Sequence, residues 1–126
     1  MDIDIEAIRA EAREQRANAS ASELEAIDRR VTELLDLLGK AHTMAILREF
    51  ALGDDAYRFS ELEDRLEVSP TTLSNRLGEL TEAGLLTRRS YDEIPPRVEY
   101  RTTETADALD PMFEHLHRWA ASHELE

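Results

Sequence analysis

The chain contains no cysteine, and only one of its fifteen basic residues, Lys40, is a lysine. Without cysteine it forms neither a disulfide nor a thiolate metal site, and it has no thiol with which to sense oxidants. No run of eighteen apolar residues occurs, so the sequence holds no candidate membrane-spanning helix. Residues 1–6 lack the basic and apolar segments of a signal peptide, and we therefore expect a cytoplasmic protein without a membrane partner.

Acidic residues are strongly in excess. Fifteen basic and twenty-eight acidic residues give the 126-residue chain a formal net charge of −13. A charge of this size usually argues against nucleic acid as a partner. Abundant carboxylates with almost no lysine are also typical of extreme halophiles, because molar salt shortens the Debye length to about 3 Å and screens carboxylate repulsion. We predict an origin in a halophilic archaeon; an ordinary acidic protein of a low-salt cytosol is the alternative.

This charge is unevenly distributed along the chain. Residues 69–101 contain five arginines and five acidic residues, so this segment has no net charge. The entire excess of negative charge lies outside it. If any surface of the protein binds a polyanion, residues 69–101 are the best candidate.

Two helices are predicted before residue 40. Residues 3–17 are rich in good helix formers and belong to an acidic helical extension over residues 1–21. Ser22 and Glu25 fit a capping box that opens the second helix, which Gly39 ends. Its apolar residues follow a heptad-like spacing, which fits either packing on its own domain or a seam shared with a second subunit: Leu24, Ile27, Val31, Leu34 and Leu38.

The next segment predicts two further helices. Thr43 is the expected N-cap of a helix that runs to Phe50 and ends at Gly53. Residues 54–58 are interpreted as a loop. Ser60 with Glu63 fits another capping box, which would open a short helix over residues 61–66.

The helix that begins after Ser69 carries the most informative pattern. Ser69 is a good N-cap and Pro70 suits the first helical position, because its missing N–H is not needed there. Leu73, Leu77 and Leu80 recur at spacings of four and three, which places them on one buried face. The outward face is small and polar, which suits the floor of a DNA groove: Thr71, Thr72, Ser74, Asn75 and Arg76.

A hairpin and a final helix follow. Gly84 ends the preceding helix, residues 85–91 and 97–103 alternate as strands, and residues 92–96 form a proline-containing tip. Residues 104–123 predict a helix, in which Pro111 causes either a kink or a new start at Asp110. The expected fold is mainly α with a small β-hairpin: a winged helix-turn-helix over residues 22–103, followed by a C-terminal dimerisation helix over residues 104–126.

Several segments resemble the HxlR-type winged helix-turn-helix regulators of the MarR and PadR-like group. The matching stretches lie at residues 37–40, 45–49, 58–62, 69–77, 80, 84–85 and 91–100, and the last, which ends in Pro-Pro-Arg-Val-Glu-Tyr, is the most specific. The resemblance implies a homodimeric transcription regulator whose N- and C-terminal helices form the dimer interface. Three family features are absent: the cysteine before the first core helix, the tryptophan of Gly-Lys-Trp, where this chain has Ala41, and the leucine of the second wing strand, where it has Thr102.

The expected DNA contacts lie on the helix after Ser69 and on the wing. Arginine pairs with guanine, asparagine with adenine, and threonine methyls with thymine methyls. Successive strand residues alternate in direction, so at most one of Arg88 and Arg89 faces DNA; ion pairs with Glu99 or Asp92 are the alternative for Arg89 and Arg101. The predicted DNA-binding residues are Pro70, Thr71, Thr72, Ser74, Asn75, Arg76, Arg88, Arg89 and Arg97.

No chemistry beyond binding is predicted. His115 and His117 are two residues apart and face different ways, so we expect no metal site, and no catalytic arrangement, cofactor or small-molecule ligand is indicated. In high salt we expect K⁺ or other salt ions to bridge surface carboxylates and phosphates at a DNA interface, with Glu79, Glu82 and Glu93 nearest.

The sequence therefore predicts a sequence-specific, nucleoid-associated transcription regulator that binds palindromic double-stranded DNA as a homodimer adapted to high salt. The alternative is a winged-helix protein–protein interaction module that reads no DNA. The expected dimer interface combines the two flanking helices: Leu24, Ile27, Val31, Leu109, Met112, Phe113, Leu116 and Trp119.

Overall fold

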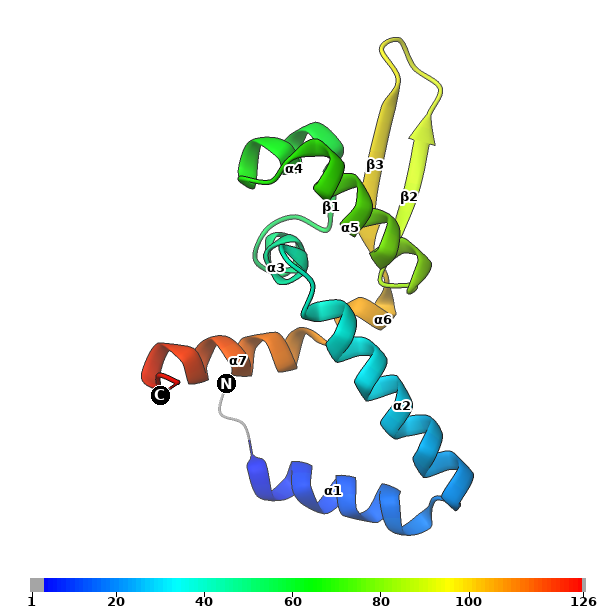
Figure 1. The fold of residues 1–126 in the computed structure, drawn as a ribbon, viewed down its shortest axis with the longest axis vertical. Coiled ribbons are helices and arrows are strands. Elements are labelled where there is room, and N and C mark those ends of the chain that lie inside the picture. Colours follow the sequence, from blue (N-terminus) through cyan, green and yellow to red (C-terminus); the bar gives the residue numbers. More distant parts are fainter. Residues whose placement is uncertain (1–3, 126) are drawn as a thin grey trace. The chain divides into compact units, whose positions relative to one another are not determined.

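The structure is a computed structural model that describes residues 4–125. It divides into two compact units, Met1–Asp36 and Leu37–Glu126, which are considered separately. Figure 1 shows the elements, which follow one another as α1 (Ile5–Asn18), α2 (Ala21–Leu38), α3 (Thr43–Leu52), β1 (Ala56–Arg58), α4 (Phe59–Arg65), α5 (Pro70–Glu82), β2 (Leu86–Tyr91), β3 (Arg97–Thr102), α6 (Glu104–Asp107) and α7 (Asp110–Ser122).

The first unit contains α1 and most of α2. The α1 helix confirms the expected N-terminal helix, although Ile3 lies outside the described residues. The predicted Ser22–Glu25 capping box is wrong, because α2 already begins at Ala21. Ser20 caps it instead: its Oγ accepts a hydrogen bond from the Glu23 N–H at 3.2 Å and donates one to Glu23 Oε1 at 3.1 Å.

One ion pair joins the two helices of this unit. Arg16 Nη1 lies 2.9 Å from Asp28 Oδ1, and Arg16 Nη2 donates to Asp28 Oδ2 at 3.4 Å. The guanidinium therefore binds the carboxylate with both of its terminal nitrogens, which fixes the orientation as well as the distance. It lowers the pKa of Asp28, chiefly through the hydrogen bond.

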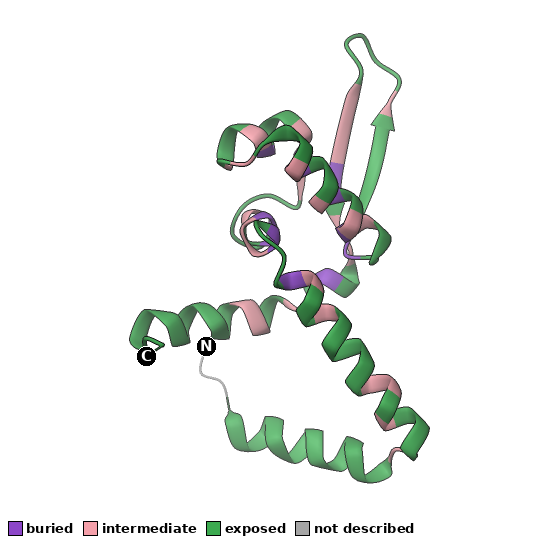
Figure 2. Cartoon of the chain, in the orientation of Figure 1, coloured by how far each residue is buried: buried purple, intermediate pink, exposed green. Residues whose placement is uncertain are grey.

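The core of the second unit forms where α3, α4, α5 and the sheet meet (Figure 2). Leu73, Leu77 and Leu80 have no exposed side-chain surface, which confirms the predicted inner face of α5. Ser69 caps α5 as expected, accepting the Thr72 N–H at 3.2 Å, and Gly84 adopts φ +79° after its end. Both ends of α5 therefore follow the sequence signals.

The sheet has a strand that the sequence did not predict. Residues 54–58 were expected to be a loop, but β1 pairs antiparallel with β3, in the strand order β1-β3-β2. Tyr57 is 1% exposed, and its ring packs edge-on against Phe50 with centroids 5.2 Å apart. Its hydroxyl donates to the Glu49 carbonyl oxygen at 3.3 Å. A three-residue strand is too short to show alternation in a sequence, which explains the error.

Two helix starts also differ from expectation. Thr43 is buried as the first residue of α3, and the cap position belongs to His42, whose φ is 73°. The helix continues two residues beyond Phe50, to Leu52. The α4 helix begins at Phe59 rather than 61, and the Arg58 N–H donates to Glu61 Oε1 at 2.8 Å. The predicted Ser60–Glu63 capping box is therefore wrong.

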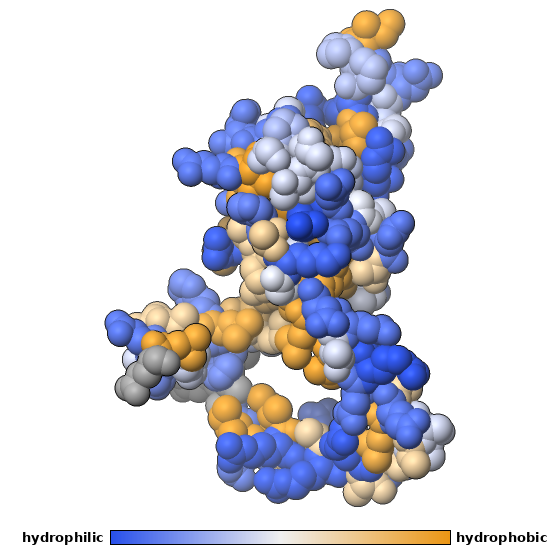
Figure 3. All heavy atoms as spheres, in the orientation of Figure 1, coloured by the Kyte–Doolittle hydropathy of each residue, from blue (hydrophilic) through white to orange (hydrophobic). Residues whose placement is uncertain are grey.

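The C-terminal segment forms two helices, α6 and α7. Pro111 lies in the first turn of α7, which confirms the expected new start at Asp110. No residue of α7 is buried; Leu116 is 46% and Trp119 40% exposed. Apolar side chains reach the surface along α7, as Figure 3 shows in orange. No helix within residues 4–125 is long and apolar enough to cross a membrane.

Candidate nucleic-acid interface

The outward face of α5 is small and polar, as expected. Pro70, Thr71, Ser74 and Asn75 are exposed on the first half of the helix. Thr72 is half-buried, and its Oγ1 accepts a hydrogen bond from Ser69 Oγ at 3.0 Å, so its hydroxyl belongs to the cap. The side chains left open to a ligand are two hydroxyls and one amide, beside a proline ring.

Arg76 is held within the protein. Its Nε donates to the Ala41 carbonyl oxygen at 2.9 Å, and its Nη1 lies 2.8 Å from Glu79 Oε1. Glu79 also pairs with Lys40, the only lysine of the chain. Hydrogen bonds from Lys40 and then Arg76 lower the pKa of Glu79. This network, Lys40–Glu79–Arg76, ties α5 to the turn between α2 and α3.

In this arrangement Arg76 helps to hold α5 against the turn between α2 and α3. A base contact by Arg76 would require its guanidinium to leave both Ala41 and Glu79. The predicted DNA contact of Arg76 stays a prediction, but the side chain, at 22% exposure, is already satisfied by the protein. The sequence contained no signal for this, since Ala41 and Arg76 are 35 residues apart.

The two wing strands divide their arginines between two faces. Arg88 lies opposite Tyr100 and Arg89 opposite Glu99 in the pairing of β2 with β3. Successive residues of a strand point to opposite faces, so Arg88 and Arg89 diverge, as predicted. Arg88 Nη1 donates to Ser90 Oγ at 3.3 Å.

The other face of the wing is occupied by a stack on Tyr91. The Cζ atoms of Arg89 and Arg97 lie 4.7 and 3.9 Å from the centre of the Tyr91 ring, within cation–π distance. Arg97 also pairs with Glu93 at 3.3 Å. Arg89 therefore makes an aromatic contact where an ion pair with Glu99 was the alternative. Arg101 does pair with Glu99, at 3.5 Å along the same strand.

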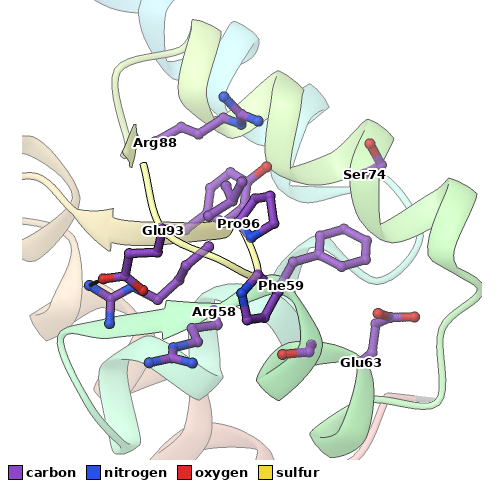
Figure 4. Close-up of a pocket in the computed structure, with 12 residues that line it drawn as sticks. Arg58, Phe59, Glu63, Ser74, Arg88, Glu93 and Pro96 are labelled. Atoms are coloured by element: carbon purple, nitrogen blue, oxygen red, sulfur yellow. Dashed lines mark ion pairs between the residues drawn. The ribbon is translucent and has the colours of Figure 1, made fainter. Parts of the chain in front are cut away.

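A cavity of about 610 Å³ lies between α4, α5 and the wing (Figure 4). It brings together three of the predicted DNA-binding residues, Ser74 from α5 and Arg88 and Arg97 from the wing. Arg58, at the junction of β1 and α4, also lines it and was not predicted, because residues 54–58 were interpreted as a loop. Its pairing opposite Glu99 in β3 could be found only from the fold.

The apolar residues expected at a dimer interface are only partly covered. On α2, Leu24 and Ile27 are half-buried and Val31 is 50% exposed. At α7, the N-cap residue Leu109 is half-buried, as are Met112 and Phe113, while Leu116 and Trp119 are exposed. Each helix thus retains apolar surface at the predicted positions. Within residues 4–125, no group of three or more His, Asp or Glu side chains could hold a metal ion.

A protein-family model and known sequences agree in matching this chain to helix-turn-helix regulators. The HxlR-like helix-turn-helix family model matches residues 37–126. An HTH-type transcriptional regulator of Halalkalibacterium halodurans is 36% identical over 91 residues, covering 71% of this chain and 80% of that protein. An HTH-type transcriptional regulator of Mycobacterium tuberculosis is 39% identical over 89 residues, covering 71% of this chain but only 55% of that protein.

Solved structures agree with this assignment. The HTH-type transcriptional regulator ytcD superposes with a TM-score of 0.68 at 30% identity, covering 74% of this chain and 94% of its own. The reduced form of the regulator YodB from Bacillus subtilis gives a TM-score of 0.63 at 30% identity, covering 72% and 88%. The winged helix-turn-helix fold predicted from the sequence is therefore confirmed.

The Lys40–Glu79–Arg76 network predicts a pH-dependent stability. Because the pKa of Glu79 is lower in the folded state, its contribution is present above the unfolded-state pKa and is lost as the pH falls through the folded-state pKa. Glu79→Gln should be less stable than the wild type at pH 7, and the difference should close in acid. Urea unfolding between pH 7 and pH 3 measures this.

Glu82→Gln is the matched control, because Glu82 is exposed on the same helix and makes no ion pair among the described residues. It should change the free energy of unfolding little at any pH. A difference between Glu79→Gln and the wild type that stayed constant across this pH range would contradict the role assigned to the network.

Proposed function

Because the chain belongs to the HxlR-like helix-turn-helix family of DNA-binding transcription regulators, we propose that it binds an imperfect inverted repeat as a homodimer. The α5 helix enters the major groove, and the wing lies against the neighbouring backbone or minor groove. The family assignment favours this function over a protein-interaction module, and the family consists of regulators rather than enzymes.

The observation that supports this proposal most strongly is the outward face of α5. A helix in the major groove reads bases with side chains near its N-terminus. Here that part of α5 exposes Thr71, Ser74 and Asn75 around Pro70, and none of these three polar side chains makes a hydrogen bond among the described residues. Asn75 suits adenine and the Thr71 methyl suits a thymine methyl. These residues supply the sequence preference; the arginines of the wing supply contacts to phosphates.

Dimerisation compensates for the small number of cations on α5. The helix carries one arginine, Arg76, which the Lys40–Glu79–Arg76 network already holds. One copy of such a surface offers little electrostatic affinity, whereas two linked copies bind with a high effective concentration. The exposed apolar residues of α7 and the apolar positions of α2 support a second subunit as the partner that covers them.

The domain assignment follows from this function. Residues 22–103 form the DNA-binding part, and residues 104–126 contribute to dimerisation. The acidic residues 1–21 form an N-terminal helical extension that contains α1, which has no buried residue of its own. Because the chain has no cysteine, it senses no signal through a thiol of its own.

Salt ions take part in the binding that we propose. With a net charge of −13, the protein releases few phosphate counterions when it binds and instead takes up cations between its own carboxylates and DNA. Of the carboxylates expected near the groove, Glu79 and Glu93 are paired with basic side chains. Glu82 makes no ion pair within residues 4–125, so it is the best candidate to hold such a cation.

Selection from random duplexes tests the DNA-binding function. The wild type should enrich an inverted repeat with half-site centres about 34 Å apart. Asn75→Ala should relax the preference at one base pair of each half-site, by about 1–3 kcal/mol. Glu33→Gln, on the exposed face of α2, is the control and should select the same sequence as the wild type. If no duplex is enriched, the protein is not a sequence-specific regulator.

Trp119→Asp tests the dimer interface. Trp119 is 40% exposed, whereas Phe113 is half-buried beside core residues, so Trp119→Asp perturbs the surface with less risk to folding than Phe113→Asp. The variant should be monomeric by multi-angle light scattering and should lose affinity for the selected duplex at least 100-fold, in line with the gain from bivalency.

Ala121→Asp provides the matched control, because two residues along a helix turn it by about 200° and place Ala121 on the far side of α7. It introduces the same charge and should stay dimeric. If Trp119→Asp were still dimeric, α7 would not be the interface.

The salt proposal predicts an unusual titration. Between 0.1 and 2 M KCl, wild-type affinity for the selected duplex should fall only weakly or rise, because cation uptake offsets counterion release. Glu82→Gln should steepen the decline, since one cation site is removed, whereas Glu33→Gln should not. A steep inverse dependence of wild-type affinity on KCl, as ordinary basic DNA-binding proteins show, would overturn the proposal.

A further inference from the structure

The pairing register divides the residues of the sheet between two faces. Residues directly opposite each other in an antiparallel pair point to the same face, and successive residues of a strand alternate. Tyr57, Leu86 and Tyr100 are buried on the face that packs on the helices. The opposite face has no buried residue and is open to a partner. We call it the outer face, and it consists of Ala56, Arg58, Thr87, Arg89, Tyr91, Arg97, Glu99 and Arg101.

The outer face is rich in arginine although the protein is acidic. Four of its eight residues are arginines, and Glu99 is the one carboxylate among them. Glu99 pairs with Arg101, and Glu93 at the wing tip pairs with Arg97. Four arginines against these two carboxylates leave two positive charges, whereas the whole chain carries −13. A surface with a charge opposite to that of the rest of the protein is suited to an anionic partner.

Arg58 and Arg89 carry the remaining positive charge. Each lies directly opposite Glu99, one on either side of β3, and both are exposed. Neither guanidinium makes an ion pair within residues 4–125. Their backbones are two strand spacings apart, about 10 Å, so the two side chains bind separate anionic groups. Figure 4 shows Arg58 and Arg88 on opposite sides of Pro96, in agreement with the assignment of Arg58 to the outer face and Arg88 to the other.

The direction of the outer face indicates which part of a duplex it meets. The opposite face of the sheet packs on the helices, so the outer face turns away from α5. With half-site centres one turn apart, a single minor groove lies between the two α5 helices of a dimer. That groove, about 6 Å wide, is too narrow for two wings, so each wing lies in the minor groove on the outer side of its half-site. Two sugar–phosphate strands bound this groove, and the outer face meets the one farther from α5.

We propose that the outer face of the sheet binds the sugar–phosphate backbone of DNA that flanks the inverted repeat, through Arg58 and Arg89. Guanidinium groups bind phosphate oxygens in charge-assisted hydrogen bonds. The proposal rests on the proposed function and adds Arg58 to the DNA-binding surface. These contacts read no sequence; they lengthen the bound stretch of DNA beyond the bases that α5 reads. Glu99, between the two arginines, opposes the phosphates and limits the affinity.

Duplexes of two lengths test this inference. One is the selected inverted repeat alone, and the other extends it at each end by one helical turn, about 10 bp. At 0.1 M KCl, where contacts to phosphates are strong, the wild type should bind the extended duplex about tenfold more tightly, as expected for a charge-assisted hydrogen bond. Arg58→Ala and Arg89→Ala should each bring the ratio of the two affinities close to one.

Two further variants sharpen the comparison. Arg88→Ala is the charge-matched control, because Arg88 precedes Arg89 in β2 but lies on the other face. It should weaken binding of both duplexes and keep the wild-type ratio. Glu99→Gln should raise the ratio severalfold, because it removes the carboxylate between Arg58 and Arg89. Unchanged far-ultraviolet circular dichroism and melting temperature confirm that each variant is folded, and multi-angle light scattering measures its oligomeric state.

The outcomes separate the inference from the function on which it rests. If the wild type binds both duplexes equally, or if Arg58→Ala and Arg89→Ala keep the wild-type ratio, the outer face does not bind flanking DNA and the regulator function stands. If either variant is folded but monomeric, the outer face binds a second copy of the chain and the proposal is overturned. If no duplex is selected at all, the proposed function fails and the inference fails with it.

Discussion

The burial of one face of α5 is the constraint on which the DNA-binding surface depends. Leu73, Leu77 and Leu80 are fully buried, and each contributes about 1.5–3 kcal/mol relative to an exposed position. Since these three positions fix the rotation of the helix about its axis, they also decide which residues point outward. The cap at Ser69 fixes where the helix begins. The small polar surface of α5 is therefore a consequence of core packing, although none of its residues belongs to the core.

Rotation alone does not fix the helix along its axis, and the Lys40–Glu79–Arg76 network supplies the missing restraint. It joins α5 to the turn before α3 through a backbone carbonyl and two charges. The network contains Lys40 and Arg76, two of the fifteen basic residues of the chain. The wing follows the same pattern, because Arg97 is held by Glu93 and Tyr91. Arg76 and Arg97, which the sequence predicted as DNA contacts, thus restrain α5 and the wing, the two elements that we expect to contact DNA.

The sequence predicted those parts of the fold that depend on local or periodic signals. The leucine spacing, the Ser69 cap, Gly84 and the hairpin after α5 were all read correctly, because each is encoded within a few residues. The errors share a different cause. The strand β1 is three residues long and is defined by pairing with β3, more than forty residues later. At α2, Ser20 competes with Ser22, which fits the same capping motif. At α4, the arginine side chain has no acceptor and only the Arg58 N–H bonds Glu61, so no capping motif in the sequence marked this start.

The same reasoning explains why the fold changes how Arg76 and Arg58 are interpreted. By sequence, Arg76 lies on the recognition helix and Arg58 lies in a loop, so only Arg76 attracts attention. In the fold, Arg76 has a carbonyl and a carboxylate within hydrogen-bonding distance, whereas Arg58 makes no ion pair in the described part of the chain. An arginine available to a phosphate is one that the protein has not already neutralised. In a chain this acidic, the pairing of each arginine within the fold therefore has to be considered together with its position on the recognition helix.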